Sequence, residues 1–292
     1  MLIAMPYPTM TFLPLLVAEE KGFFTAQRVN AYCVQIQAGG SEKVARLVAE
    51  GEIGFMTSLT NAMEAILGGW GIKFLCATTL TKFPCVARTE IRSIEDLKGK
   101  KVMSGGGRSN TDMLFLSSRC GLRPGVDFEV VHGDSVGRAK AFEDPTIAAV
   151  FARSHFLYWG TKAGFKPLYY PDPGMGWYEG GLAAGVSLIT EHPDTVQKVV
   201  NAVVLATEFI KSNEEESVNV ALKRIPQLDR AEAEGNYRIL LEGFAGELQP
   251  SVIDYMARVV AAIRGARQPI ATEAFADLSF LRRARALTAG KG

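Results

Sequence analysis

Hydrophobic and polar positions follow two alternating periods along the first third of the chain. Short apolar or alternating runs typical of strands occur at residues 2–8, 29–37, 53–58 and 73–80. Apolar residues at helical spacing, with glycines marking the helix ends, occur between them at residues 12–24, 41–52 and 60–69. Strands that alternate with helices in this way predict a parallel sheet with helices on both faces.

A second run of strands and helices begins near residue 93. Ser93 and Asp96 match the S-x-x-D capping box of a short helix. Strands are then expected at residues 101–106, 127–134, 147–152 and 166–172, and helices at residues 111–120 and 137–142. Pro84 argues against a central strand in the segment just before this run, because proline cannot donate to a ladder.

The remainder of the chain reads as one long extended segment followed by helices. The extended segment covers residues 178–189, and helices are expected at residues 193–213, 214–225, 230–244 and 250–263. We therefore predict two α/β domains joined by two extended crossings. The first domain would comprise residues 1–81 and 183–292, and the second residues 82–182.

Composition narrows the functional classes. The chain has 292 residues, of which 48% are hydrophobic and 22% charged, as in an ordinary globular protein of one or two domains. The net charge is +1, and no basic stretch is interleaved with aromatics, so we expect no nucleic-acid partner. Apolar runs such as residues 199–205 are too short to span a bilayer.

The first residues and the cysteines leave alternatives open. MLIAMPYPTM lacks the basic and apolar regions of a leader, as in a mature chain whose leader was removed or a protein that never had one. The four cysteines, Cys33, Cys76, Cys85 and Cys120, fit no zinc spacing, so no metal site is expected. Free, buried thiols are favoured over a disulfide among them.

The segment KKVMSGGGRSNTDMLFL, which begins at Lys100, carries the strongest chemical signal. A strand meets three glycines, and Arg108, Ser109, Asn110 and Thr111 then stand at the start of an expected helix. The free N–H groups of a helix start, together with a guanidinium, suit a carboxylate, sulfonate or phosphate. The alternative is an ordinary helix cap without a ligand.

Other loops after the expected strands are also rich in glycine, hydroxyls or cations. Because ligands of open α/β sheets bind beyond the carboxyl ends of the strands, we predict one polar cleft between the domains. Arg153 would hold a second acidic group, and Glu179 would pair with an arginine or stay exposed. The predicted ligand-binding residues are Thr9, Met10, Phe12, Gly40, Ser41, Thr57, Ser58, Arg108, Ser109, Asn110, Thr111, Arg153 and Glu179.

Several segments resemble the solute-binding proteins of ABC importers for sulfonates, nitrate, taurine and thiamin pyrimidines. They are PLLVAEEKGFF, GGSEKVARLVAEGEIGF, SIEDLKGKKVMSGGGRSN and EHPDTVQKVVNAVVLATEFIKSN. The resemblance runs from about residue 5 to residue 215 and implies the two-lobed fold of a type II periplasmic binding protein. It also implies a small organic anion as ligand, a membrane permease as partner and a periplasmic location. We expect a monomer, and a cytoplasmic location stays open.

The chain departs from this family pattern in one loop. Arg153 and His155 stand where many relatives place Trp, Glu and Pro.

An enzyme is the alternative to a binding protein. A desulfinase of this fold would need a cysteine in the first loop, but PYPTMTF has none. The cysteine-rich segment of pyrimidine synthases is also missing. A dinucleotide fingerprint fails at its third glycine, where Asn110 stands. The sequence thus predicts a binding protein without a cofactor rather than an enzyme.

Overall fold

Contacts between residues divide the chain into two compact units. Unit 1 comprises Met1–Leu80, Tyr178–Ala261 and Arg267–Gly292, and unit 2 comprises Thr81–Trp177 and Ala262–Ala266. The computed structural model describes residues 1–289 except 7, 37–40, 105–112, 115, 118, 134–136, 138–139, 152–156, 173, 245 and 265–270. Among the described residues, no helix is long and apolar enough to cross a membrane. The domain boundaries predicted from the sequence stay a prediction.

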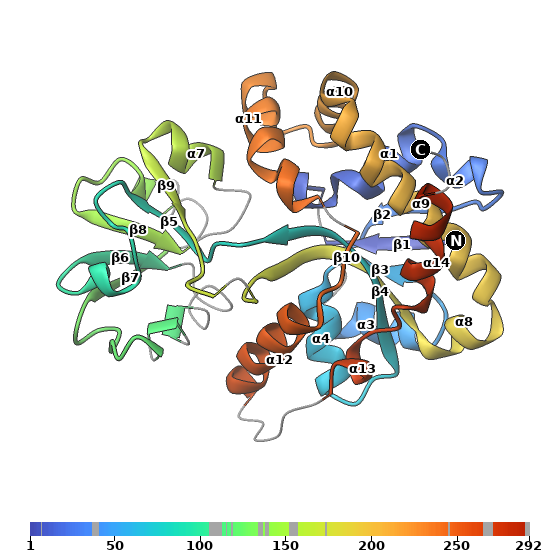
Figure 1. Cartoon of the computed structure of the whole chain (residues 1–292), viewed down its shortest axis with the longest axis horizontal. Coiled ribbons are helices and arrows are strands. Elements are labelled where there is room, and N and C mark those ends of the chain that lie inside the picture. Colours follow the sequence, from blue (N-terminus) through green and yellow to red (C-terminus); the bar gives the residue numbers. More distant parts are fainter. Residues whose placement is uncertain are drawn as a thin grey trace. The chain divides into compact units, whose positions relative to one another are not determined.

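Unit 1 contains a five-stranded mixed sheet in the order β2-β1-β3-β10-β4 (Figure 1). Its strands are β1 (Leu2–Met5), β2 (Tyr32–Gln35), β3 (Phe55–Met56), β4 (Ile72–Thr81) and β10 (Trp177–Gly185). The first three strands pair in parallel, as predicted, but β10 runs antiparallel to β3. The expectation of a purely parallel sheet is therefore wrong, because the chain returns to insert β10 between β3 and β4.

Helices cover both faces of this sheet. On one face, side chains of β1 such as Ile3 and Met5 share a hydrophobic core with α1 and α9. On the other face lie α3 and α4 (Figure 1). The helices of unit 1 are α1 (Leu13–Glu20), α2 (Phe23–Ala26), α3 (Ser41–Ala49), α4 (Leu59–Leu67), α8 (Val186–Glu191), α9 (Pro193–Ser212), α10 (Glu214–Arg224), α11 (Arg230–Leu240), α12 (Pro250–Arg264), α13 (Thr272–Phe275) and α14 (Ser279–Ala289), with 3-10 turns η1 (Met10–Phe12) and η4 (Leu241–Gly243).

Unit 2 contains a second five-stranded sheet in the order β7-β6-β8-β5-β9. Its elements are β5 (Cys85–Arg88), η2 (Glu95–Leu97), β6 (Lys101–Ser104), β7 (Glu129–His132), β8 (Ile147–Phe151), α7 (Leu157–Lys162) and β9 (Phe165–Leu168). Strand β6 pairs in parallel with β7 and β8, whereas β5 runs antiparallel to β8 and β9. The helices predicted at residues 111–120 and 137–142 lie partly outside the described residues.

Local signals explain where several elements start and stop. Gly22 has φ of +73°, which side chains rarely allow, and it separates α1 from α2 as its position in the sequence predicts. Strand β5 lies inside its sheet, between β8 and β9. Pro84 had led us to expect no central strand in this segment. The strand begins at Cys85, so the proline stays outside the ladder and costs no hydrogen bond.

An ion cluster fastens α10 to α1 and protects the edge of the unit 1 sheet. The Arg224 guanidinium bonds Glu19 at 2.9 Å and Glu20 at 3.1 Å, and Lys223 also pairs with Glu20. The bonds from Lys223 and Arg224 lower the pKa of the Glu20 carboxyl. Glu19 also accepts the backbone N–H of Cys33 at 3.3 Å, on the edge strand β2. A carboxylate on the edge of a strand discourages pairing with another chain.

The close approach of β10 to its neighbours yields a stability prediction. A Cβ atom added at Gly181 would lie 2.4 Å from the carbonyl oxygen of Cys76 and 2.6 Å from Leu59 Cδ1. We expect Gly181→Ala to lower the free energy of unfolding by about 1–3 kcal/mol, because a well-packed core resists added volume. The matched control is Gly71→Ala, whose Cβ would lie 3.8 Å from Val186. Equal urea-denaturation midpoints for the two variants would contradict this account.

Candidate functional site

Thr57 and Ser58 lie at the carboxyl end of β3, in the centre of the unit 1 sheet. The backbone N–H of Thr57 donates to Ala4 at 3.0 Å, and its carbonyl oxygen accepts the N–H of Gly181 at 2.9 Å. Thr57 is fully buried, and its Oγ1 has no hydrogen-bond partner among the described residues. The Ser58 hydroxyl accepts the N–H of Asn61 at 3.4 Å and so caps α4. These two predicted site residues therefore lie together at the carboxyl end of β3.

The turn η1 lies in the loop that follows β1. The Thr9 carbonyl accepts the N–H of Phe12 at 3.0 Å, and the hydroxyls of Thr9 and Thr11 lie 2.7 Å apart. Thr9 is half-buried, so part of this residue stays open to solvent. Met10 and Phe12 are buried in the hydrophobic core of unit 1, and their contact with a ligand stays a prediction.

Two threonines that the sequence analysis missed hold this turn in place. The hydroxyls of Thr78 and Thr79, neighbours on β4, both donate to the carbonyl oxygen of Thr11, at 2.9 and 2.7 Å. Both are fully buried. We call Thr9, Thr11, Thr78 and Thr79 the threonine clamp. Two consecutive threonines within a strand that is mostly apolar were the signal that could have drawn attention to this position.

Strand β10 approaches the clamp closely because residue 180 has no side chain. A Cβ atom at Gly180 would lie 2.5 Å from Thr78 Oγ1 and 2.9 Å from the Thr11 carbonyl oxygen. Glycine is therefore needed here for close approach rather than for an unusual φ. Glu179, also on β10, is half-buried, and its predicted pairing with an arginine stays a prediction.

The remaining predicted site residues lie outside the described part of the chain. They are Gly40, Arg108, Ser109, Asn110, Thr111 and Arg153, together with the side chain of Ser41. The structure does describe Ser104, the last residue of β6, which directly precedes the predicted anion-binding turn. Ser104 is fully buried, and its Oγ has no partner within the described chain. The carboxyl end of a strand in each unit thus carries a buried hydroxyl that has no partner in the described part of the chain.

The thiols are poorly suited to nucleophilic chemistry. None of the four cysteines forms a disulfide, and each is part of the described chain. Burial raises the pKa of Cys76 to about 12, and burial together with the Glu95 carboxylate raises the pKa of Cys120 to about 11. Burial and Glu19 likewise raise the pKa of Cys33. The thiolate is the reactive form, so raised pKa values oppose catalysis. In the described residues, no group of three or more His, Cys, Asp or Glu side chains could hold a metal.

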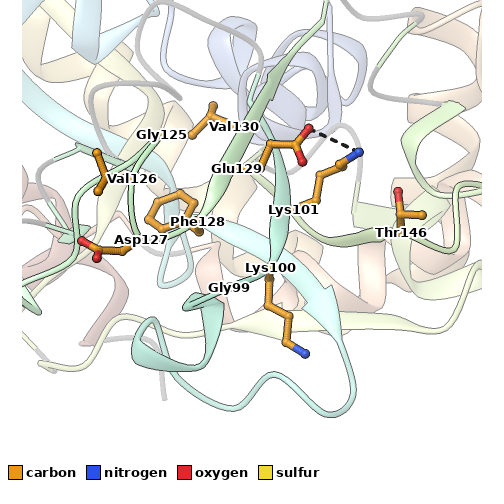
Figure 2. Close-up of a pocket in the computed structure, with 10 residues that line it drawn as sticks. All are labelled: Gly99, Lys100, Lys101, Gly125, Val126, Asp127, Phe128, Glu129, Val130 and Thr146. Carbon is orange, nitrogen blue, oxygen red and sulfur yellow. Dashed lines mark ion pairs between the residues drawn. The ribbon is translucent and has the colours of Figure 1, made fainter.

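Unit 2 also has an open hollow of about 650 Å³, but its polar groups do not converge. It lies at the amino ends of β6 and β7, where Lys101 Nζ pairs with Glu129 at 3.2 Å. Figure 2 shows this pair, with Lys100 pointing away from it. Asp127 is bound instead by Arg123, which lowers the pKa of the carboxyl. The hollow therefore offers no common point at which a ligand would be held.

Comparisons with known proteins agree on the fold. A putative periplasmic sulfonate-binding protein SsuA from Methylobacillus flagellatus KT has a TM-score of 0.74 at 15% identity, covering 100% of this chain and 95% of its own. The periplasmic aliphatic sulphonate-binding protein SsuA from Escherichia coli has 0.71 at 14%, covering 95% and 91%. The desulfurization enzyme DszB has 0.66 at 14%, covering 98% and 99%.

These neighbours establish the architecture, and the sequence establishes the family. The chain has two mixed α/β sheets with helices and the two-lobed fold of periplasmic binding proteins, as the resemblance implied. Among curated proteins, none matches the chain. The family model described as NMT1/THI5 like matches residues 9–217. That match spans well over half of the chain, which therefore belongs to the NMT1/THI5-like family.

Proposed function

We propose that this protein is the solute-binding component of an ABC importer and reversibly captures a small organic anion, a carboxylate or a sulfonate. The family match supports this proposal, as do the names of the sulfonate-binding neighbours. Under the proposal the protein works in the periplasm and delivers its ligand to a membrane permease. The ligand lies in the inter-lobe cleft that the family resemblance predicts.

The buried hydroxyl of Thr57 is the observation that carries the proposal. Leaving a buried donor unbonded costs about 1–3 kcal/mol, and buried polar groups in native proteins are nearly always paired. Thr57 stands at the carboxyl end of a strand, where ligands of open α/β sheets bind. A ligand atom that bonds this hydroxyl would recover the cost. Ser104 Oγ stands at the equivalent end of β6 and would be completed in the same way.

The acidic group of the ligand requires positive partners. In our proposal Arg108 and the N–H groups of residues 109–111 bind it, and Arg153 binds a second acidic or ring substituent. Thr9, Gly40, Ser41, Thr57, Ser58 and Glu179 contact the rest of the ligand, and Met10 and Phe12 supply apolar surface. Such a set of mainly neutral hydrogen-bonding groups suits a small, partly polar molecule.

An enzyme on the same fold is the second candidate, because DszB shares the fold. The high pKa values of Cys76 and Cys120 argue against a thiolate nucleophile. Incubation of the protein with any bound compound, followed by mass spectrometry, separates the two functions. A binding protein returns the compound unchanged, whereas an enzyme yields a product in amounts above one equivalent.

A thermal-shift screen tests the proposed ligand class. Aliphatic sulfonates, short carboxylates and pyrimidines are added singly to the wild-type protein. A compound at 100 times its dissociation constant stabilises the folded state by about 2.7 kcal/mol, which raises the melting temperature measurably. If none of the sulfonates or carboxylates shifts the melting temperature at millimolar concentration, the proposed ligand class is wrong.

Replacing Arg108 tests the predicted anion contact. We expect Arg108→Ala to weaken binding of the best compound by ~10- to 150-fold, because a hydrogen bond to a charged group contributes about 1.5–3 kcal/mol. Isothermal titration calorimetry measures the affinity, and the melting temperature without ligand serves as the folding control. Unchanged affinity would remove Arg108 from the site.

Replacing Thr57 separates stability from binding. Thr57→Val removes a hydroxyl that has no partner among the described residues, at nearly constant shape, so we expect the free energy of unfolding to stay level or rise. Binding should weaken about 2- to 12-fold, the effect of losing one neutral hydrogen bond. The matched control is Thr207→Val, whose buried hydroxyl donates to Val203 at 2.8 Å and whose loss should cost about 1 kcal/mol. Equal destabilisation by both variants, with affinity unchanged, would refute this role.

A further inference from the structure

We propose that Thr78 and Thr79 are positioning residues that fix the ligand-binding turn η1 to the strand by which the chain leaves unit 1. This inference rests on the proposed function, since it assigns η1 and Thr9 to ligand binding. Neither Thr78 nor Thr79 needs to touch the ligand. Their effect would pass through the backbone of Thr11.

The bonding of the Thr11 carbonyl oxygen shows how firmly the turn is held. A carbonyl oxygen has two lone pairs, and here each receives a buried hydroxyl, from Thr78 at 2.9 Å and from Thr79 at 2.7 Å. Successive side chains of a regular strand point to opposite faces, so the convergence of two neighbours on one atom is a specific local arrangement. The Thr11 hydroxyl then bonds that of Thr9, which extends the network to a half-exposed group.

The clamp lies next to the two strands that connect unit 1 with unit 2. Thr78 and Thr79 immediately precede Leu80, the last residue of the first segment of unit 1. Gly180 lies just after Tyr178, where the chain re-enters unit 1. The added Cβ at Gly180 would lie within 2.9 Å of both Thr78 and Thr11, so the returning strand also borders the clamp. A shift of either connecting strand would therefore move η1.

This geometry makes the occupancy of the site and the conformation of the connecting strands depend on each other. Hinge segments between domains absorb the rotation when such proteins close on a ligand. Because η1 is bonded to those segments, Thr9 would be placed for ligand binding in one arrangement of the connecting strands and moved away from that position in another. The clamp would thus raise affinity in the arrangement in which its three hydroxyl hydrogen bonds are made.

Hydrogen exchange tests the clamp without any ligand. The amides of Met10, Thr11 and Phe12 are followed by mass spectrometry in wild type, Thr79→Val and the double variant Thr78→Val/Thr79→Val. We expect exchange at η1 to accelerate about 2- to 12-fold for the single variant and further for the double variant. Thr79→Ser, which keeps the hydroxyl, should restore protection, and Thr207→Val should leave η1 unchanged. Wild-type exchange at η1 in the double variant would overturn the proposal.

The variant Gly180→Ala tests the clamp by the same hydrogen-exchange measurement while every threonine stays in place. Its added methyl group would overlap Thr78 Oγ1, so we expect it to accelerate exchange at η1 as the valine variants do. If the variant protein fails to fold, the circular dichroism spectrum shows this directly and the threonine variants decide the question. A folded Gly180→Ala protein with wild-type protection at η1 would count against the clamp.

Calorimetry with methanesulfonate and butanesulfonate then tests the link to binding. We expect Thr79→Val to weaken affinity about 2- to 12-fold, Thr79→Ser to restore it, and Thr207→Val to lower stability alone. If the wild type binds neither sulfonate, the proposed ligand class fails while the exchange experiment still decides the clamp. If the wild type binds and Thr78→Val/Thr79→Val binds equally well, the positioning role is refuted.

Discussion

The insertion of β10 between β3 and β4 is the constraint on which the rest of unit 1 depends. An antiparallel strand in the middle of a sheet must approach both neighbours and the helices on each face, and three of its residues have no room for a side chain. Gly180 faces the clamp, Gly181 faces Cys76 and Leu59, and Gly185 faces the backbone of Val48 on α3. Because β10 begins where the long segment of unit 2 ends, the sheet of unit 1 receives its last strand only after that segment has been synthesised.

Local patterns predicted the elements better than their arrangement. Apolar spacing placed α3 and α4, and the Lys21-Gly22 pair correctly ended α1, because these signals act within a few residues. The sheet order depends on contacts between distant segments, so a run such as residues 178–189 predicts extension but not the position of β10. The last four residues of that run, 186–189, belong to α8 instead, which ends at Glu191. The clamp escaped prediction for the same reason, since a hydroxyl that bonds a carbonyl 67 residues away leaves no local pattern.

In the described part of the candidate site, Glu179 is the one charged side chain and the other polar side chains are neutral hydroxyls, a set that favours binding over catalysis. The buried hydroxyl oxygens of Thr57 and Ser104 have no hydrogen-bond partner among the described residues, and under the proposed function a ligand supplies one. Nucleophilic catalysis instead requires an activated group, and the thiols with raised pKa values are the reverse of activated. The same fold serves binding and catalysis among the structural neighbours. The residues at the strand ends, rather than the fold, therefore distinguish the two functions.

Neutral hydrogen bonds also suit the proposed role of holding the turn η1 on β4 in the core of unit 1. A salt bridge buried at this point would carry a large desolvation cost, whereas the two threonine hydroxyls satisfy both lone pairs of the Thr11 carbonyl oxygen without any charge. Thr78 and Thr79 lie among core residues of β4, a strand that is buried along nearly its whole length. Under the proposed positioning role, packing holds this strand while its two hydroxyls hold η1. Strand β4 would then set the affinity of a site whose ligand it does not touch.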